Sequence, residues 1–305
     1  MDRVRALIDI SRPSTALSSV LTSIACSVSE GNPFNEVNSI VLMLLYLGVF
    51  LSHLSVNVFN DYFDYKSGLD ILTPKTPFSG GSKVLVEGRL SEREALVFGL
   101  ALLLISASIG LYLAFLRGFL IILFMLAGAA IIILYTRILT RYSLGELSVY
   151  LKGVVVGAGS SYVVFNSITP RSIILASFYG LASMIILYMN SIPDRDLDKL
   201  FGRRTLSVIT PLNRLADLYR ILIVASALNI VLISLFYGFG LLLLILSIPS
   251  LSLLIYNSVT LERILSRGFA RDLSLLSGVL GVNILSYRSL EFMLLLALML
   301  RIALY

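Results

Sequence analysis

Charged residues, cysteine and histidine are all scarce in this chain. Only 14% of its 305 residues are charged, and it holds one cysteine and one histidine. A single cysteine, Cys26, excludes an intrachain disulfide, and the scarcity of Cys and His argues against a zinc site. No linker rich in Gly, Ser or Pro interrupts the chain, so we expect one domain over residues 1–305.

Long hydrophobic runs dominate the rest of the sequence. Hydrophobic residues make up 57% of the chain, the mean hydropathy is +0.93, and apolar runs of about 18 residues or more recur. This pattern predicts an all-α, polytopic membrane protein. The N-terminus lacks the features of a removable signal peptide, so we expect the first span to be retained. Nine transmembrane helices are expected, at about 14–29, 37–60, 94–115, 117–135, 145–166, 171–193, 216–237, 239–257 and 289–305.

The distribution of positive charge predicts the topology in the cell membrane. Lys and Arg gather in alternate loops, whereas the opposite loops hold little beyond Arg117 and Arg171. We therefore expect the long loops and the N-terminus to be cytoplasmic and, with nine spans, the C-terminus to lie outside. The net charge of +6 reflects this topology, and nucleic-acid binding is not expected. Within residues 258–288, segment 261–271 has an amphipathic pattern and 273–285 fits a short or re-entrant helix; an extra span there would move the C-terminus inside.

Two groups of carboxylates stand out at the ends of the second and sixth spans. The first runs from Asn57 through Asp64 to Asp70, and the second from Asn190 to Asp198. Acids at the mouth of a membrane span are costly, so function is their default interpretation. The pattern NxxxD occurs in both groups, four spans apart. This recurrence suggests two four-helix pseudo-repeats followed by a ninth helix.

The spacing of these residues favours a shared hard cation. Residues i and i+4 lie on one helix face, which pairs Asn60 with Asp64 and Asn190 with Asp194. Oxygen ligands favour Mg²⁺, which usually completes its shell with water and substrate phosphates. Nearby Lys and Arg side chains would neutralise a departing diphosphate, and the faces of Tyr and Phe would stabilise the allylic cation left behind. The cationic candidates near the acids are Lys83, Lys199, Arg203 and Arg204.

Several motifs together resemble the UbiA superfamily of intramembrane prenyltransferases, over nearly the whole chain. They are Ile10-Ser-Arg12-Pro13, the NxxNDYFD run at 57–64, the GGSKVLVEG loop at 80–88, Leu144-Gly145-Glu146, the DxxxD at 194–198 and Gly202-Arg-Arg-Thr205. The first acidic motif and the loop are closest to the menaquinone-type branch and its eukaryotic relatives. The resemblance implies a nine-helix bundle around a central cavity, capped on the cytoplasmic side, where the active site would face the cytoplasm.

The resemblance also assigns roles to individual residues. It implies that Mg²⁺ and a polyprenyl diphosphate are bound by both acidic motifs, whose catalytic and metal-binding residues would be Asn60, Asp61, Asp64, Asn190, Asp194 and Asp198. The family pattern expects an acid at position 68, but this chain has Gly68, so Asp70 is added as a metal ligand. The family's YxxxK element begins at Tyr135, yet position 139 is Leu139; Arg137 or Arg141 would then supply the cation.

Four further residues are candidates for contact with the prenyl chain or the acceptor: Asn57, Tyr135, Tyr188 and Lys152. Each has an alternative. Asn57 and Asn190 also suit hydrogen bonds between helices, the two tyrosines suit the membrane interface, and Lys152 suits snorkelling to the surface. His53 is expected to be a packed residue.

Three functions remain open from the sequence, and a fourth, another phosphoalcohol-type transferase that uses Mg²⁺ and paired Asp, is less favoured because its DxxDG-type signature is absent. The first is Mg²⁺-dependent transfer of a polyprenyl group from its diphosphate to an electron-rich aromatic acceptor, a quinone precursor such as a dihydroxynaphthoate. Transfer to a glycerol-phosphate ether lipid precursor is the alternative within the same family. A cation-coupled secondary transporter would also explain a repeat and buried acids. The expected partners are the isoprenoid diphosphate, a lipophilic or aromatic acceptor and the lipid bilayer, with no nucleic acid.

Overall fold

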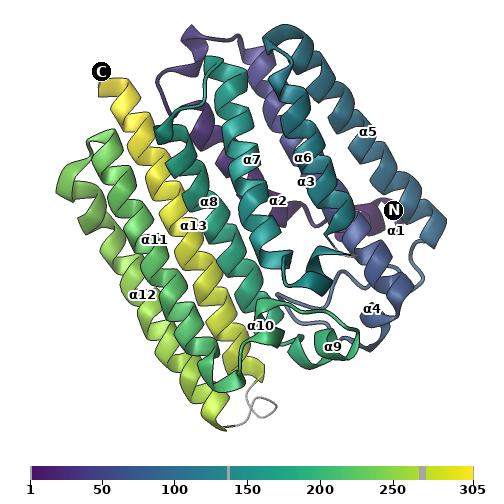
Figure 1. Cartoon of the computed structure of the whole chain (residues 1–305). Helices are drawn as coiled ribbons and strands as arrows, with labels where there is room; N and C mark the ends of the chain where they lie inside the picture. The colour runs from purple at the N-terminus through teal and green to yellow at the C-terminus, as the bar shows by residue number, and fades with distance from the viewer. Residues whose placement is uncertain (1, 136–137, 268–272, 305) are drawn as a thin grey trace.

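The computed structural model describes residues 2–135, 138–267 and 273–304, and every regular element within them is helical. The long helices form one bundle, and short helices gather at one end of it (Figure 1). The long helices are α2 (Pro13–Ser27), α3 (Ser39–Ser67), α5 (Glu92–Arg117), α6 (Leu120–Leu134), α7 (Gly145–Phe165), α8 (Pro170–Ser191), α11 (Leu215–Tyr237), α12 (Gly240–Arg267) and α13 (Leu273–Leu304). The short helices are α1 (Asp2–Ser11), α4 (Leu69–Leu72), α9 (Arg195–Leu200) and α10 (Leu206–Ile209).

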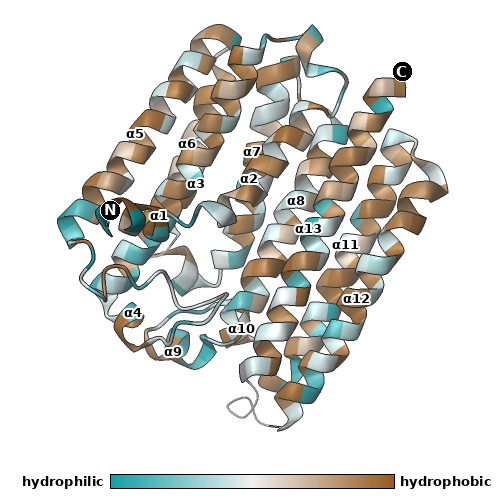
Figure 2. Ribbon diagram, turned by 180° about the vertical axis from the view of Figure 1, so that it is seen from behind, coloured by the Kyte–Doolittle hydropathy of each residue, from teal (hydrophilic) through white to brown (hydrophobic). Residues whose placement is uncertain are grey.

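Length and hydropathy make this chain an integral membrane protein. Six described helices, namely α3, α5, α7, α8, the segment 212–237 containing α11, and α12, are long and apolar enough to cross a membrane. Their outer surfaces carry many exposed large hydrophobic side chains. Figure 2 shows these helices as mainly hydrophobic, with hydrophilic residues gathered around α4 and α9. The count of nine spans and the two pseudo-repeats stay predictions.

The C-terminal region corrects one expectation. Residues 273–285 are the first half of α13 and form no separate short or re-entrant helix. Contacts with two other helices hold this segment: the Tyr219 hydroxyl donates to Oδ1 of the buried Asn283 over 2.9 Å, and Asn257 donates to the Val279 carbonyl over 2.8 Å. Segment 261–267 continues α12, while Arg271 lies outside the described residues.

Small residues allow α7 and α8 to pack closely. A Cβ added to Gly153 would lie 2.3 Å from the Cα of Gly180, and one added to Gly180 would lie 2.5 Å from the Tyr150 carbonyl oxygen. Membrane helices associate through such contacts because small residues let the backbones approach. The close packing fixes Glu146 and Lys152, both on α7, relative to α8.

The ends of α3 and α8 place the acidic residues together. Gly68 ends α3 in a left-handed conformation (φ 83°), and α4 follows at once, which turns Asp70 back toward α3. Asp194 is the N-cap residue of α9, just beyond the end of α8. Since α4 and α9 contact each other, the two acidic segments meet at one end of the bundle.

Candidate active site

Arg203 joins the two acidic segments. Its guanidinium donates to the carboxylate of Asp64, at the end of α3, and lies 3.5 Å from Oδ1 of Asp198, on α9. Both carboxylates are almost fully buried. Charges removed from water need a partner, so one guanidinium between two acids offsets part of their repulsion.

Asp61 is held by two other segments. Nη2 of Arg12, at the start of α2, lies 2.8 Å from Oδ1 of Asp61, and the backbone N–H of Ser82 donates to Oδ2 over 3.0 Å. Only 2% of Asp61 is exposed. These charge-assisted bonds fix the carboxylate between α2, α3 and the loop after α4.

Asp70 packs against that same loop. Lys83 Nζ donates to the backbone carbonyl of Asp70 over 2.5 Å and lies 4.0 Å from its carboxylate. A Cβ on Gly81, whose φ is +69°, would lie 2.9 Å from Oδ1 of Asp70, so only glycine fits there without strain. Burial, and then the charges of Asp64 and Asp61, raise the pKa of Asp70 to about 7.

Asp194 completes the acidic group. The Ser79 side chain and the Gly80 backbone donate hydrogen bonds to it, which favours its charged form. Burial and the charge of Asp198 outweigh them and raise the pKa of Asp194 to about 6. The loop 79–83 therefore touches acids of both segments.

Two basic residues of the site have unusual backbone conformations. Arg12 has φ 44° and Lys83 has φ 67°, both in the left-handed region that L-residues other than Gly, Asn and Asp rarely adopt. A strained backbone of this kind persists only where surrounding contacts hold it in place, and such residues are common at functional sites. Here each strained residue contacts an acid.

Unpaired oxygens test whether the site fits a divalent cation. Oδ1 of Asn190 and Oε2 of Glu146 are buried without a hydrogen-bond partner. Within the described residues no three His, Cys, Asp or Glu side chains lie close enough together to hold a metal, and Asp61 and Asp64 are paired with arginines instead. The oxygen donors fit a hard cation such as Mg²⁺ in their chemistry.

Comparison with known proteins identifies the family. The model of the UbiA prenyltransferase family matches residues 16–267, more than half of the chain. The chain belongs to this family. It is therefore a prenyltransferase, and the resemblance noted in the motifs is confirmed.

Two curated UbiA-type relatives differ in acceptor. The chain is 25% identical over 248 residues to a digeranylgeranylglyceryl phosphate synthase from Korarchaeum cryptofilum (strain OPF8), a match that covers 81% of this chain and 83% of that protein. It is 27% identical over 175 residues to a 1,4-dihydroxy-2-naphthoate octaprenyltransferase from Bacillus subtilis (strain 168). The second match covers 55% of each chain.

Solved structures share the fold. A UbiA homolog from Aeropyrum pernix K1 superimposes with a TM-score of 0.66 at 17% identity, covering 93% of this chain and 98% of that one. A UbiA homolog from Archaeoglobus fulgidus, bound to GPP and Mg²⁺, gives 0.60 at 16% identity, covering 95% and 99%. At these identities the similarity establishes the UbiA fold.

Two residues predicted to contact substrate also make hydrogen bonds between helices. Nδ2 of Asn57 donates to the Ser11 carbonyl over 2.7 Å and to Thr15 Oγ1 over 2.8 Å, so it links α3 to the N-terminal helices. Tyr188 is fully buried in the hydrophobic core, and its hydroxyl donates to the Leu215 carbonyl over 2.8 Å. The Asn57 amide N–H groups and the Tyr188 hydroxyl therefore join helices, and contact of these residues with a substrate stays a prediction.

The remaining candidates are spread around the site. Arg141, Lys199 and Arg204 are exposed; the backbone N–H of Arg204 donates to the Thr140 carbonyl, and that of Arg141 donates to the Ile138 carbonyl. Tyr135 lies within electrostatic reach of Arg203. Asn60 is half-buried and has an interaction of its own, while Arg137 lies outside the described residues.

Sequence reasoning missed three residues of this UbiA-type site. Arg12 and Glu146 stood in recognised motifs but were given no role, and Ser82 acts through its backbone. Oε1 of Glu146 accepts a hydrogen bond from the Leu206 N–H over 2.8 Å. A charge beside a proline at the mouth of the first span was the available signal for Arg12.

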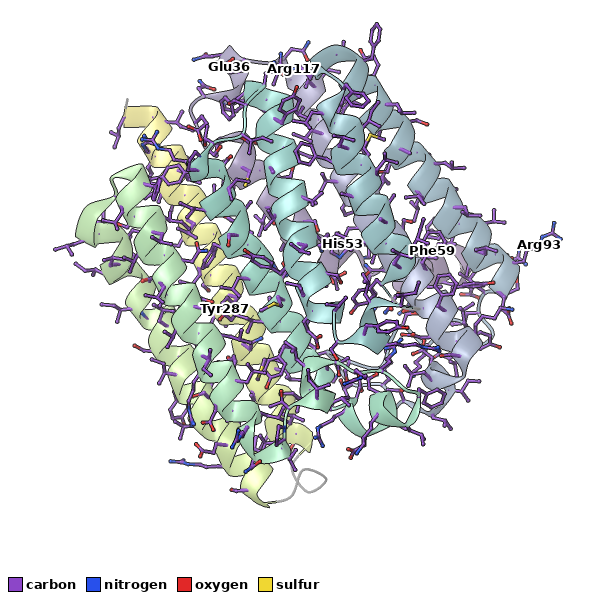
Figure 3. The ribbon with its side chains drawn as sticks, in the orientation of Figure 1. Glu36, His53, Phe59, Arg93, Arg117 and Tyr287 are labelled. Atoms are coloured by element: carbon purple, nitrogen blue, oxygen red, sulfur yellow. The ribbon has the colours of Figure 1, made fainter. Side chains whose placement is uncertain are left out.

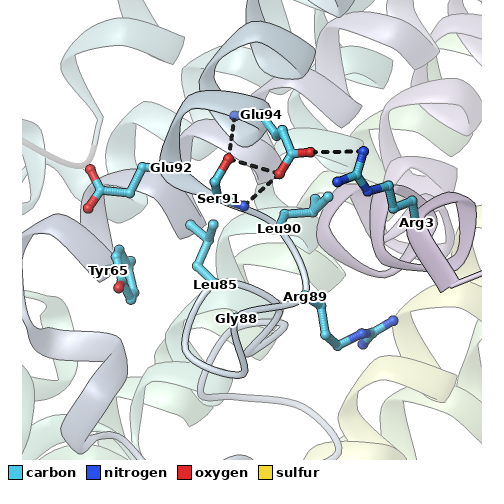
Figure 4. A pocket seen from close by; sticks show the side chains of 9 residues that line it. All are labelled: Arg3, Tyr65, Leu85, Gly88, Arg89, Leu90, Ser91, Glu92 and Glu94. Carbon is cyan, nitrogen blue, oxygen red and sulfur yellow. Dashed lines mark hydrogen bonds and ion pairs between the residues drawn. The ribbon is translucent and has the colours of Figure 1, made fainter.

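One surface hollow lies apart from these residues. It is lined by residues of α1, the end of α3 and the start of α5, including Arg3, Tyr65 and Glu94 (Figure 4). Among its polar residues, Ser91 and Glu94 form a capping box, and Arg3 pairs with Glu94 over 3.6 Å. No acid of the two motifs lines it.

Proposed function

We propose that this protein transfers a polyprenyl group from its diphosphate to an electron-rich aromatic acceptor, a quinone precursor such as a dihydroxynaphthoate, within the membrane. One observation carries the proposal: Arg203 contacts Asp64 and Asp198, so acids from both motifs share one positive charge. Membership of the UbiA family supports it independently.

The two motifs would hold Mg²⁺. Its ligands would come from the residue set Asn60, Asp61, Asp64, Asp70, Asn190, Asp194 and Asp198. The unpaired Oδ1 of Asn190 supports this assignment, because a buried amide oxygen without a donor suits a cation. When bound, the ion supplies positive charge to the diphosphate as its bond to carbon breaks.

The basic side chains of the protein would have two roles: binding the diphosphate and attracting it to the site. Arg203, Arg12 and Lys83 already contact acids of the site, so each is positioned to turn toward a diphosphate that enters between them. Arg203 would exchange a carboxylate for phosphate oxygens, which match its planar guanidinium equally well. Exposed Lys199, Arg204 and Arg141 would attract the anionic substrate from the cytoplasm.

The distribution of Lys and Arg predicts which side of the membrane the site faces. The basic loops and the acidic segments share one end of the bundle, and Lys and Arg favour the cytoplasmic side of short loops. This supports a site that faces the cytoplasm.

A second acceptor is favoured by a specific observation. The glycerol-phosphate ether alternative is supported by the relative that matches 81% of this chain, while the motif form supports the aromatic acceptor. The transporter alternative is set aside because the chain is a prenyltransferase. Competition between 1,4-dihydroxy-2-naphthoate and a prenylglyceryl phosphate for one labelled prenyl diphosphate identifies the acceptor by product.

Release of diphosphate tests the proposal. We expect it to require Mg²⁺ and to fall at least a hundredfold in Asp64→Asn and in Asp198→Asn. Asp196→Asn is the matched control, because the Asp196 side chain is 86% exposed on the same short helix. Undiminished turnover in both site variants would refute the proposed site.

A further inference from the structure

Three charged side chains lie inside the bundle, outside the two acidic segments. Lys152 is on α7, and Arg288 and Glu291 are on α13. The charges of Arg288 and Glu291 act on Lys152, and those of Lys152 and Arg288 act on His53 of α3. His53 lies about midway along the bundle (Figure 3). These residues, Lys152, Arg288, Glu291 and His53, are called the inner cluster.

Glu291 and Arg288 are paired with each other. Arg288 Nη1 donates to Oε2 of Glu291, one turn along α13. Glu291 is fully buried, and its backbone carbonyl accepts a hydrogen bond from the Tyr179 hydroxyl over 2.8 Å. Oε1 of Glu291 has no partner. The pair is neutral as a unit and still offers one unused acceptor.

Lys152 is the uncompensated charge. Among the described residues its ammonium group makes no hydrogen bond and no ion pair. His53, whose ring bonds to Ser19 Oγ over 2.7 Å, adds no countercharge, because an imidazole is either neutral or positively charged. Counted in their charged forms, Lys152 and Arg288 outnumber Glu291 by one positive charge, and Lys152 stands on α7, which is long and apolar enough to cross a membrane. Such a charge is expensive in a membrane and is normally matched by a partner or a ligand.

The inner cluster lies near the acidic segments. Lys152 follows Glu146 by six residues on α7, about 9 Å along the axis. Side chains on a helix lean toward its N-terminus, which directs Lys152 toward the end where Glu146 and Arg203 lie. His53 precedes Asp61 by eight residues on α3, about 12 Å along the axis. An acceptor held by Lys152 would lie between the cluster and the diphosphate site.

We propose that Lys152, beside the Arg288–Glu291 pair, binds the anionic group of the acceptor. This inference rests on the proposed function and specifies its acceptor: a carboxylate or a phosphate must accompany the nucleophilic atom. The two acceptors considered above share that chemistry, a carboxylate in one and a phosphate in the other. The free Oε1 of Glu291 is an acceptor for a hydroxyl of the same molecule.

Binding without turnover tests the site directly. Equilibrium dialysis of the purified full-length protein would use labelled 1,4-dihydroxy-2-naphthoate and a labelled prenylglyceryl phosphate, each with its neutral counterpart, 1,4-dihydroxynaphthalene or the prenylglycerol. Lys152→Met should weaken binding of at least one anion tenfold or more and leave its neutral counterpart unchanged. Lys152→Arg should retain affinity within about threefold. The anion that responds identifies the acceptor class.

A matched control separates the site from general charge effects. Lys66→Met removes an exposed lysine at the end of α3, paired with Glu92 over 2.9 Å, and should bind both anions like the wild type. In turnover, Lys152→Met should raise the KM for the acceptor and leave the KM for the prenyl diphosphate unchanged. Lys152→Gln repeats the comparison should the Met variant fail to fold.

Three outcomes overturn the inference: no binding of either anion by the wild type, equal anion affinity in wild type and Lys152→Met, or equal losses for anionic and neutral ligands. A rise in the KM for the prenyl diphosphate instead would assign Lys152 to the diphosphate and also overturn it. If the wild type binds an anion through Lys152 yet releases no diphosphate, the proposed function fails while this site stands.

Discussion

The guanidinium of Arg203 contacts the carboxylate of Asp64 although 139 residues separate them in the chain. Asp198 shares the same guanidinium. The positive charge between the two motifs is therefore supplied by a side chain of the protein itself, the Arg203 guanidinium. This arrangement keeps two buried acids compatible before any ligand binds.

Arg203→Ala should destabilise the metal-free protein, because two buried acids would lose their shared partner. Removing one member of a buried pair costs about 3–5 kcal/mol. Added Mg²⁺ should restore part of the loss by replacing the missing charge. Thermal unfolding with EDTA and with Mg²⁺ measures both effects, and an equal loss in the two conditions would contradict this explanation.

Arg12→Ala should reduce diphosphate release at least tenfold, because Asp61 would lose its charged donor. Arg5→Ala, an exposed arginine on α1, is the control and should retain full activity. Steady-state assays at saturating Mg²⁺ compare them. Equal activity in both variants would show that Arg12 serves topology alone.

Gly81→Ala should impair the enzyme more than Gly88→Ala. Both glycines have left-handed φ, +69° and +67°, so both alanines cost about 1 kcal/mol in backbone strain. Only Gly81 would place its Cβ against the Asp70 carboxylate; at Gly88 nothing lies within 4 Å. Comparing the Mg²⁺ dependence and the melting temperature of the two variants separates the clash with Asp70 from backbone strain. Identical behaviour of the two variants would show that Asp70 is not part of the site.

Two asparagines should respond in opposite ways. Asn57→Ala breaks two hydrogen bonds between helices and should lower stability by about 1–3 kcal/mol with little change in Mg²⁺ dependence. Asn190→Ala removes an oxygen without a partner and should leave stability unchanged while raising the Mg²⁺ concentration needed for half-maximal activity. Melting curves and Mg²⁺ titrations of both variants test this prediction. If Asn190→Ala lowered stability and Asn57→Ala weakened the Mg²⁺ dependence instead, the roles assigned to the two residues would be wrong.

The sequence predicted the membrane helices and the gathering of acids well, because both depend on local patterns. Hydropathy indicates the long helices, but the NxxxD spacing wrongly predicted Asn190 and Asp194 on one helix face, because α8 ends at Ser191 and Asp194 is the N-cap of α9. The sequence did not reveal which side chains make tertiary contacts. Tyr188 and Asn57 face neighbouring helices, which helical spacing alone does not reveal.

Backbone contacts were equally hidden from the sequence. Ser82 reaches Asp61 with its amide N–H, which every residue but proline possesses. Arg12 depends on a left-handed φ before Pro13 to reach the same acid. Residues 273–285, predicted as a short or re-entrant helix, belong to the long helix α13, and the contact of Asn283 with Tyr219 on α11 was not visible in the sequence.

The central claim is that both acidic motifs hold the same divalent ion site with the diphosphate. Electron paramagnetic resonance of Mn²⁺, titrated into the purified protein with geranyl diphosphate, measures this most directly. Asp64→Asn and Asp198→Asn should each weaken Mn²⁺ binding strongly, and the double variant should lose little more than either alone. Full Mn²⁺ affinity in both single variants, or losses that simply add, would contradict a shared site.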